Sequence, residues 1–466
     1  MAQWIAGITR GHNGAVCLLK DGELVFHLEE ERLSRQKYDG GPLAGMVKIL
    51  DYTDKLDYLV IAHTQPLQET AGKIDFSGDD VYTGLARKLG LIDQKYEGRE
   101  HPQVIDYAWV HHKLHAACAF YRSGFESATA VIVDGAGTFI PMMFGDTQEM
   151  TWELETIFSC EYPANFKTLV KHQGGRGPWM SAKMTVPSDR EGEPGTHELI
   201  IDDTAGIVKA YEAVTQYCGW QPIEAGKTMG LAPYGNSNDA IPPIYTDDGG
   251  SEWVTSNRNL IIPTYPNGAV VNENRYEFLK TAEEDYSGDL TKLQSRRDLA
   301  YAVQSESQQR VLDLILDAVE RTGNKNVVLS GGYGLNCVAN YWYLEELNKH
   351  GINLYAEPIS SDAGTCIGAA YMHYHSLMKD MNVRPYADSL YLGPQYNYTD
   401  EEIDSVVEKY DGHLQEFTTE EVVKLMRDKN IVAMFQGRSE AGPRALGNRS
   451  LMFDPTFEDG KDHVNR

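Results

Sequence analysis

Closely spaced cysteines are absent from this sequence of 466 residues, whose six cysteines are scattered without a Cys-x-x-Cys pair. That distribution predicts neither a disulfide framework nor a cysteine-ligated zinc site, and it favours a reducing environment. No apolar run approaches the roughly 20 residues that a membrane-spanning helix needs. The first residues, MAQWIAGITRGHNG, lack the basic region and apolar core of a signal peptide. The sequence therefore predicts a cytoplasmic protein that does not enter a membrane.

Basic residues are also scarce. The chain has 42 Lys and Arg against 68 Asp and Glu, a formal net charge of -26. Because nucleic-acid phosphates are held by clusters of Lys and Arg, this balance argues against a nucleic acid as partner. The acidic excess is compatible with a small cationic or sugar-like substrate. The alternative explanation is that it only keeps the protein soluble. The length and the 42% of hydrophobic residues allow two or three domains with their own cores.

Short apolar runs separated by glycine-containing turns predict β-strands in the first part of the chain. These runs lie at residues 4–8, 15–19 and 23–28. A similar pattern returns later, where a Gly-rich turn separates apolar runs at residues 128–133 and 139–144. Two strand–turn–strand units of this kind indicate an internal duplication.

Helical spacing of apolar residues at 114–121 and 298–322, followed by a strand at 326–329, predicts an α/β layer architecture. A stretch with Pro, Tyr and Gly but no helical period, near residues 381–396, predicts a linker. The sequence after it predicts two amphipathic helices and one strand, at residues 401–410, 419–428 and 431–435.

Two histidines and two aspartates form a candidate metal site. His111 and His115 are four residues apart, so a helix would place both imidazoles on one face, as a shared ion requires. Asp134 follows a predicted strand and Asp362 lies between a strand and an Ala/Gly-rich helix, where α/β proteins place ligands. Each aspartate could instead only form a turn or cap a helix, and most histidine pairs bind no metal. The residues alone leave both explanations open.

Three glycine-containing segments are candidate anion sites. SGGYG at 330–334 could bring its backbone close to a phosphate or an adenosine, although Gly-Gly after a strand is often only a tight turn. Lys227, within GKTMGLAPYG, could meet phosphate oxygens or simply lie in solvent. GRSEAGPRALGNRS at 437–450 holds three arginines, which bind phosphate bidentately or form surface salt bridges. We expect these arginines to converge on one anion-binding surface of a smaller domain at the C-terminal end of the sequence: Arg438, Arg444 and Arg449.

Taken in order, these segments resemble the O-carbamoyltransferases of the NodU/CmcH family over nearly the whole chain. Family members begin GxxxxHDSAAxLxxDGxxxxAxxEERFxRxKHD, and this sequence has GITRGHNGAVCLLKDGELVFHLEEERLSRQKYDGGP, with Asn13 and Tyr38 replacing an Asp and a His. Later family motifs appear as HHKLHAACAF, VDGAGT, GKTMGLAPYG, GGYGLNCVAN, DAGTCIGAA and GRSEAGPRALGNRSLM. Thr138 replaces the acid that usually ends the second of them.

The resemblance implies an α/β fold with two domains. A duplicated domain similar to actin and sugar kinases (ASKHA), and to the tRNA threonylcarbamoyl transferase, would span residues 1–380. After a linker at 381–396, residues 397–466 would form the N-terminal part of a YrdC-like domain. Because family members continue beyond this point, we expect that domain to be incomplete. Whether the sequence is a natural truncation or a fragment stays open.

The resemblance also implies a biosynthetic reaction and its site residues. The smaller domain would make carbamoyl-adenylate from carbamoyl phosphate and ATP with Mg²⁺, and the larger would transfer the carbamoyl group to a hydroxyl of a small-molecule acceptor. Fe²⁺ or a similar divalent ion would bind to His111, His115, Asp134 and Asp362. Nucleotide binding would involve Lys227, Gly331, Gly332 and Asn336. His12 would be a base near the acceptor hydroxyl and Lys37 a cation near the developing charge. Carbamoyl phosphate and ATP would contact Arg438, Arg444, Arg449 and Ser450.

Two alternative functions stay open. The first is that of the tRNA-modifying relative, against which the net charge of -26 and the arginine-rich segment argue. The second is a non-catalytic metal- and nucleotide-binding remnant. The sequence does not indicate the acceptor or the oligomeric state, for which a homodimer is the commonest arrangement.

Overall fold

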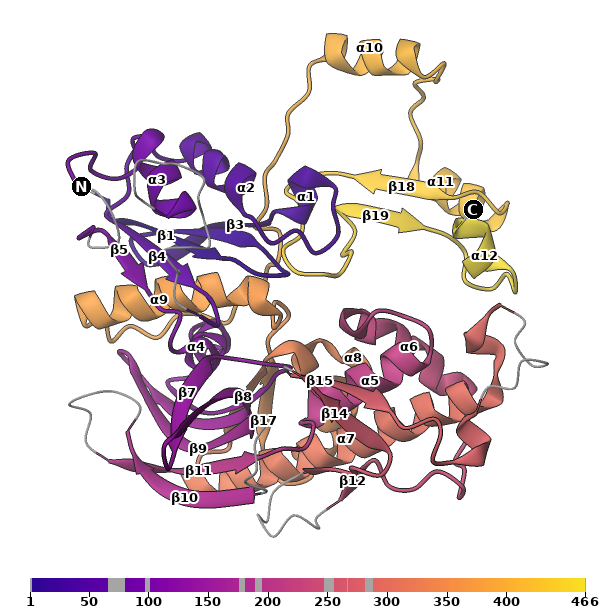
Figure 1. Cartoon of the computed structure of the whole chain (residues 1–466). Coiled ribbons are helices and arrows are strands. Elements are labelled where there is room, and N and C mark those ends of the chain that lie inside the picture. The colour runs from indigo at the N-terminus through magenta and orange to yellow at the C-terminus, as the bar shows by residue number, and fades with distance from the viewer. Residues whose placement is uncertain are drawn as a thin grey trace.

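The computed structural model describes residues 2–65, 80–96, 101–175, 181–188, 195–246, 255–265, 267–280 and 288–465. Two β-sheets, with helices between and around them, make up most of this α/β structure (Figure 1). No described helix is both long enough and apolar enough to cross a membrane.

The first sheet has the strand order β3-β2-β1-β4-β5. β1, β2 and β3 pair antiparallel, and they confirm the three strands expected near the N-terminus. β4 and β5 run parallel to β1. Helices cover both faces, so its apolar runs are continuous rather than alternating. The strands are β1 (Trp4–Thr9), β2 (Ala15–Lys20), β3 (Glu23–Glu29), β4 (Tyr58–Ala62) and β5 (Val104–Asp106).

The second sheet repeats this topology. Its five central strands have the order β9-β8-β6-β16-β17. On one side of β6 the pairings are antiparallel, β6 with β8 and β8 with β9, and on the other side β16 and β17 run parallel to β6. The expected duplication is therefore visible in the strand order. β7, β10 and β11 extend the sheet. The strands are β6 (Ser127–Val133), β7 (Phe139–Phe144), β8 (Thr147–Glu161), β9 (Asn165–Gly175), β10 (Ser181–Pro187), β11 (Thr196–Asp202), β16 (Asn326–Ser330) and β17 (Asn353–Ala356).

One detail of the expected repeat is wrong. The run at 139–144, taken from sequence as the second strand of the repeat, is β7, and it does not pair with β6. The partner of β6 is the second half of β8, while the first half of β8 forms a hairpin with β7. A 15-residue strand is long enough to pair with two different neighbours in succession, which a local pattern does not reveal.

Two helices lie between the sheets and pack on each other: α4 (His111–Arg122) and α9 (Thr365–Met378) (Figure 1). α9 packs on β1, β2 and β4, and α4 packs on β6 and β16. A Cβ atom at Gly368 of α9 would lie 1.9 Å from the carbonyl oxygen of Leu114 in α4, so only glycine permits this approach. The expected helix at 114–121 is confirmed, but it begins earlier, at His111.

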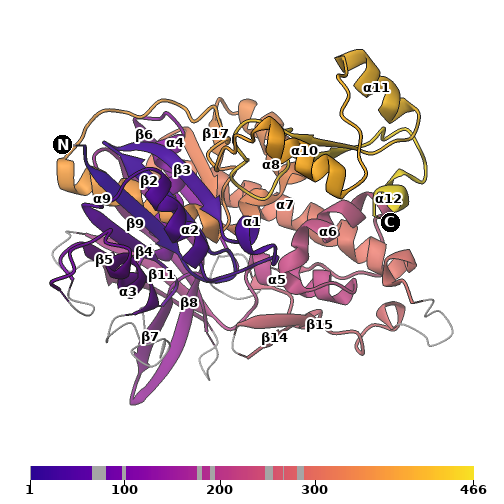
Figure 2. The same ribbon diagram turned by 90° about the horizontal axis from the view of Figure 1, so that it is seen from above.

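The remaining helices of this part of the chain lie on its periphery. Figure 2 places α5, α6 and α7 on the opposite side of the molecule from the first sheet. α7, which contains the helix expected at 298–322, packs on β6 of the second sheet. The helices are α1 (Glu31–Ser34), α2 (Leu43–Lys48), α3 (Val81–Lys88), α5 (Ile207–Tyr217), α6 (Ala225–Leu231), α7 (Gln294–Thr322) and α8 (Cys337–Asn348). Four short strands form two hairpins: β12 (Tyr245–Thr246), β13 (Thr255–Ser256), β14 (Ile261–Thr264) and β15 (Gly268–Val271).

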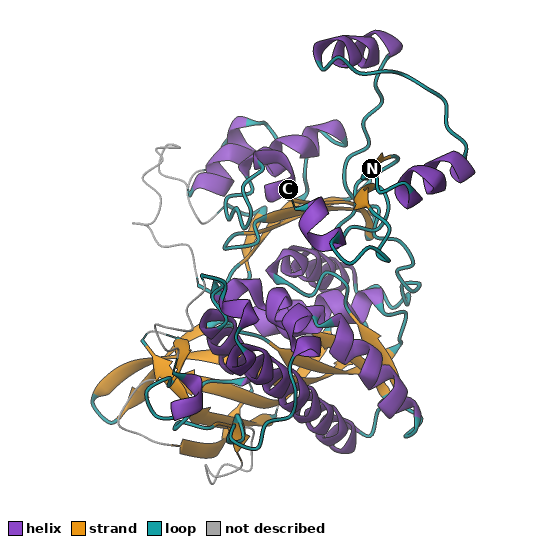
Figure 3. Cartoon of the chain, turned by 90° about the vertical axis from the view of Figure 1, so that its right-hand side faces the viewer, coloured by secondary structure: helices purple, strands orange, loops and turns teal. Residues whose placement is uncertain are grey.

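The C-terminal segment contains the two helices and the strand expected there, but they bury little surface. Neither α10 nor α11 has a buried residue, and among the described residues β18 pairs only with β19. In Figures 1 and 3, α10 stands apart from the rest of the chain. The YrdC-like assignment therefore stays a prediction. The elements are α10 (Asp400–Lys409), α11 (Thr419–Arg427), β18 (Val432–Phe435), β19 (Arg449–Met452) and α12 (Gly460–Val464).

One loop of this segment returns to the N-terminal sheet. Ala441 is buried, and Arg32 donates a hydrogen bond to the carbonyl oxygen of Gly442 (2.8 Å). Arg438 donates to the carbonyl oxygen of Val25 in β3 (2.8 Å). Residues around 438–442 thus pack on the larger part of the structure, although they lie beyond the expected linker at 381–396. The domain division stays a prediction.

Candidate metal centre and adjoining cavity

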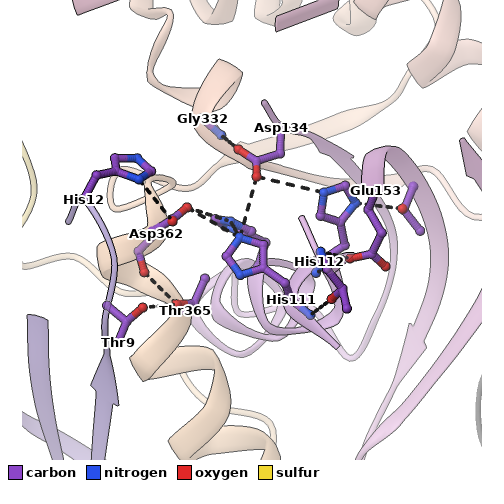
Figure 4. Close-up of polar contacts among 12 residues, drawn as sticks. Thr9, His12, His111, His112, Asp134, Glu153, Gly332, Asp362 and Thr365 are labelled. Atoms are coloured by element: carbon purple, nitrogen blue, oxygen red, sulfur yellow. Dashed lines mark hydrogen bonds and ion pairs between the residues drawn. The ribbon is translucent and has the colours of Figure 1, made fainter. Parts of the chain in front are cut away.

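The four side chains expected to bind a metal come together between the two sheets (Figure 4). His111 and His115 lie one turn apart on α4. Asp134 directly follows β6, and Asp362 opens the short helical turn that leads into α9. One ligand atom from each side chain lies within 4.8 Å of those of the other three. Residues separated by 251 positions along the chain, 111 to 362, therefore share one site.

The distances between these atoms fit a single ion. The Nε2 atoms of His111 and His115 are 3.1 Å apart. Oδ1 of Asp362 lies 3.5 and 3.7 Å from them, and Oδ2 of Asp134 lies 3.6 Å from Nε2 of His111. Ligands about 2.1 Å from one ion and at right angles are roughly 3 Å apart. Two imidazoles and two carboxylates suit Fe²⁺ or a similar divalent ion. The donor set fits a metal, whose presence stays a prediction.

The electrostatics of the four residues favour a cation. Burial by itself lowers the pKa of His111, but Asp362 and Asp134 raise it to about 10. Burial would raise the pKa of both carboxyl groups, yet His111 and other neighbouring imidazoles hold them well below their usual range. The carboxylates are therefore anionic, and an ion that binds His111 must displace a proton from it.

The turn after Asp134 supports the start of α4. Thr138, which stands where the family has an acid, accepts a hydrogen bond from the backbone N–H of His111 (3.0 Å). The N–H of Thr138 in turn donates to Oε2 of Glu153 (2.8 Å). The replacement therefore satisfies a free N–H at the first turn of the helix that carries both histidines.

A cavity of about 770 Å³ adjoins Asp134 and Asp362, a size typical of small-molecule sites. Eight of the expected site residues line it: His12, Lys37, Asp134, Lys227, Gly332, Asn336, Asp362 and Arg444. The two metal-site histidines lie behind this wall and are buried. The sequence did not point to His63 or Tyr333, which also line the cavity.

His12 is the expected base, and it lies beside the metal site. Its Nδ1 is 3.7 Å from Oδ2 of Asp362, and its side chain is half exposed to the cavity. The two expected lysines are each paired with an acid. Nζ of Lys37 donates to Glu31 (2.7 Å), and Nζ of Lys227 donates to Glu224 (2.5 Å). Their roles toward a substrate stay predictions.

The Gly-Gly turn has a role that the sequence did not indicate. Gly331 has a φ of +89°, and a Cβ atom there would lie 2.4 Å from the carbonyl oxygen of Val133. The N–H of Gly332 donates to Oδ1 of Asp134 (2.9 Å). The turn therefore orients a candidate metal ligand. Asn336 caps α8 by accepting from the N–H of Ala339 (3.1 Å). Contacts of these residues with a nucleotide stay predictions.

The three arginines have different hydrogen-bond partners, and their convergence on one anion-binding surface stays a prediction. Only Arg444 lines the cavity, and it donates to the carbonyl oxygen of Leu335 (3.1 Å). The guanidinium of Arg438 donates to backbone carbonyls of Val25, Leu392 and Gly393. That of Arg449 donates to the carbonyls of Gln436 and Gly437 and lies over the ring of Phe435.

The carboxylate of Glu440 organises the backbone of the loop that carries these arginines. Its Oε1 accepts backbone N–H groups of Leu446, Asn448 and Arg449 at 2.9 to 3.0 Å, so the loop curls around a carboxylate. Burial would raise the pKa of Glu440, but these N–H groups lower it. Ser450 lies in β19, where its hydroxyl accepts the N–H of Gly447 (2.9 Å).

A buried histidine supports the cavity from its far side. His172 of β9 lies between Glu155 and Asp202, with its Nδ1 2.5 Å from the first and its Nε2 2.7 Å from the second. Glu155 also accepts the N–H of Ile207, the first residue of α5 (2.9 Å). Because α5 contributes part of the cavity wall, the cluster holds that wall against the second sheet.

This cluster predicts a pH-dependent stability. Burial lowers the pKa of His172, but Asp202 and Glu155 raise it from 6.5 to about 10. Its contribution is therefore complete below about pH 6.5 and is lost as the pH rises through 10. Between pH 7.5 and 9.5 the free energy of unfolding of the wild type should fall by up to about 2–3 kcal/mol more than that of His172→Gln. Urea unfolding at both pH values measures this, and parallel pH slopes would contradict it.

Comparison with known proteins identifies the family. A family model described as Carbamoyltransferase N-terminus matches residues 70–371, and one described as Carbamoyltransferase C-terminus matches residues 423–466. Nodulation protein NolNO of Sinorhizobium fredii is 26% identical over 474 residues, which cover 97% of this chain and 60% of that protein. A 3'-hydroxymethylcephem-O-carbamoyltransferase of Amycolatopsis lactamdurans is 24% identical over 470 residues, which cover 99% of this chain and 75% of that protein.

Solved structures are more distant. Full-length HypF in its phosphate- and nucleotide-bound form is 13% identical, with a TM-score of 0.44, over 80% of this chain and 56% of that chain. At that score the likeness does not establish a shared fold. The N-terminal family model, in contrast, matches more than half of the sequence, and the chain therefore belongs to the carbamoyltransferase family.

Proposed function

We propose that this protein is an O-carbamoyltransferase, which moves a carbamoyl group from carbamoyl-adenylate to a hydroxyl of a small molecule. The observation that carries the proposal is the convergence of His111, His115, Asp134 and Asp362 at the wall of a cavity that also holds His12. Membership of the carbamoyltransferase family supports it, and the cephem relative acts as an O-carbamoyltransferase by its name. A small-molecule acceptor also agrees better with a net charge of -26 than a tRNA does.

In this proposal the four residues would hold Fe²⁺ or a similar divalent ion, which would supply a Lewis acid toward the carbamoyl carbonyl. His12 supplies the base. Because its Nδ1 faces the carboxylate of Asp362, that nitrogen keeps its proton and Nε2 is left to accept one. The acceptor oxygen bonds to the carbamoyl carbon and its proton moves to Nε2 of His12. The bond from that carbon to the phosphate oxygen breaks, and AMP leaves.

Cationic side chains on the cavity wall would meet the phosphate of the adenylate. Lys37, Lys227 and Arg444 line the same cavity as the base. We assign the formation of carbamoyl-adenylate, from carbamoyl phosphate and ATP with Mg²⁺, to the C-terminal segment. The match of the C-terminal family model to residues 423–466 supports this assignment.

A direct test supplies the chain with Fe²⁺, pre-made carbamoyl-adenylate and a panel of hydroxylated small molecules, and follows AMP release and the mass of each acceptor. We expect an acceptor to gain the mass of one carbamoyl group, with one AMP released for each transfer. An acceptor-independent AMP signal with no carbamoylated product in any reaction would contradict the proposal and favour the non-catalytic remnant.

His12→Gln should slow the transfer step by about 10²–10⁴-fold, because the amide cannot accept the proton of the acceptor. The affinity of the chain for Co²⁺, a spectroscopic substitute for Fe²⁺, should change by less than about threefold, because His12 is no metal ligand in this proposal. Single-turnover transfer and Co²⁺ titration measure the two effects. An unchanged transfer rate at saturating metal would exclude His12 as the base.

A further inference from the structure

The middle histidine of HHKLH contributes no atom to the metal cluster, yet it lies against it. His112 is fully buried, and its Nδ1 lies 2.7 Å from Oγ1 of Thr156. Within the described part of the chain its Nε2 has no hydrogen-bond partner. That nitrogen faces Oδ2 of Asp134 at 4.0 Å, on the side of this carboxylate away from His12 (Figure 4).

A buried polar atom without a partner costs about 1–3 kcal/mol, so the position of this ring needs an explanation. The backbone at Gly137 packs closely against the ring. A Cβ atom at Gly137 would lie 2.6 Å from its Nε2 and 2.7 Å from Oε2 of Glu153. Glu153 is itself held by Nζ of Lys171 (2.9 Å) and by the N–H of Thr138 (2.8 Å). The fold therefore keeps Nε2 aimed at Asp134.

His112 does not fit as a fifth ligand. Its ring centroid lies 6.2 Å from that of His111 and 6.5 Å from that of His115, whereas those two rings are 4.7 Å apart. One residue along a helix also turns a side chain by about 100° from its neighbour. The ring therefore approaches Asp134 from outside the space that the four ligand atoms enclose.

We propose that His112 is a positioning residue that orients Asp134 for metal binding. In this proposal the ring carries its proton on Nε2, which faces the carboxylate oxygen Oδ2 of Asp134 at 4.0 Å, and Nδ1 accepts the hydroxyl of Thr156 2.7 Å away. The N–H of Gly332 holds Oδ1 of the same carboxylate. Asp134 is thus hydrogen-bonded at Oδ1 and faced by His112 at Oδ2, an arrangement that can orient a ligating carboxylate. This inference rests on the proposed metal site.

Two substitutions distinguish the role of Nε2 of His112 from that of Nδ1. In His112→Gln the amide nitrogen reaches the position of Nε2, so the donor toward Asp134 is kept. In His112→Asn the shorter amide reaches only the position of Nδ1, so the contact with Thr156 is kept and the donor toward Asp134 is lost. Co²⁺ is titrated into the full chain, and its visible absorption reports both affinity and ligand geometry. Circular dichroism checks that each variant is folded.

We expect His112→Asn to bind Co²⁺ about 10–100-fold more weakly than the wild type, with an altered absorption spectrum. His112→Gln should stay within about threefold of the wild type. If His112→Asn does not fold, Thr156→Val replaces it, because the loss of the hydroxyl frees the proton of the ring to move to Nδ1. That variant should bind Co²⁺ about 3–10-fold more weakly.

Wild-type affinity in His112→Asn, or in Thr156→Val where that variant replaces it, would overturn the inference while leaving the metal site standing. Equal weakening in His112→Asn and His112→Gln would also overturn it, because the Nε2 position would then not matter. A wild-type chain that binds no Co²⁺ would instead refute the metal site of the proposed function, and the inference with it.

Discussion

Asp362→Asn should lower the affinity for Co²⁺ or Fe²⁺ by at least about 100-fold and slow carbamoyl transfer by about 10³-fold or more. This carboxylate faces three histidines. Its Oδ1 lies within 3.7 Å of Nε2 of both His111 and His115, and its Oδ2 faces Nδ1 of His12. An amide of the same shape removes one negative ligand and the group that keeps the proton of His12 on Nδ1. Metal titration and single-turnover transfer measure the two losses separately.

Asp317→Asn is a matched control for this substitution. Asp317 forms an ion pair with Arg321 on α7, where its side chain is 39% exposed and does not line the cavity. The same chemical change there should leave metal affinity and transfer within about twofold, because surface ion pairs contribute little. If Asp362→Asn bound Co²⁺ as tightly as this control, the assignment of Asp362 as a ligand would be wrong.

Glu357→Gln should lower the free energy of unfolding by about 3–5 kcal/mol, because it leaves a buried guanidinium without its counter-charge. Arg122, near the end of α4, donates from Nε to both carboxylate oxygens of Glu357 (3.2 and 3.0 Å), and both side chains are buried. Glu357 also accepts from the hydroxyl of Tyr355 and from the N–H of Ile359. Urea unfolding of wild type and variant measures the effect.

A double-mutant cycle distinguishes the contribution of the ion pair to stability from that of side-chain packing. Arg122→Met alone leaves a buried carboxylate unpaired, whereas Arg122→Met combined with Glu357→Gln leaves no buried charge. The double variant should therefore lose less stability than the two single variants together, by more than about 1 kcal/mol. Additive losses, or a loss below about 1 kcal/mol for Glu357→Gln, would show that the pair does not stabilise the fold.

The same ion pair connects stability to the metal site. Arg122 belongs to the helix that carries both histidines, and Glu357 fixes the start of the loop that leads to Asp362. Weakening it allows the two sides of the site to move apart. The sequence carried no signal for this pair, because 235 positions separate its partners and neither residue stands in a motif that suggests the other.

The parts of the candidate site that depend on neighbouring residues could be predicted from the sequence. The i, i+4 spacing places His111 and His115 on one helix face wherever that helix packs. The strand-end positions of Asp134 and Asp362 made them candidates, and the resemblance to a family favoured ligands over turn residues. The partners that hold these ligands, such as the N–H of Gly332 and the ring of His112, come from strand ends and helices that meet only in the folded chain.

The directions of the side chains in the arginine-rich segment, in contrast, could not be predicted from the sequence. Its composition suggested one anion site, but the direction of each guanidinium depends on which backbone carbonyls the loop meets. The guanidinium groups of Arg438 and Arg449 donate hydrogen bonds to such carbonyls, and of the three arginines only Arg444 lines the cavity. Composition reports what a segment can bind, whereas the carbonyl oxygens that surround each guanidinium in the folded chain decide where it points.

By itself the sequence determined the features whose causes are local: the strands at the N-terminus, the helix with its two histidines and the order of the family motifs. Only the tertiary structure decided that β8 rather than β7 pairs with β6, that Arg438 donates to the carbonyl oxygen of Val25, and that His112 faces Asp134. The physical reason is that local preferences act through a few neighbouring dihedral angles and side-chain periods. Pairing, burial and charge contacts instead depend on segments that the chain brings together only when its core forms.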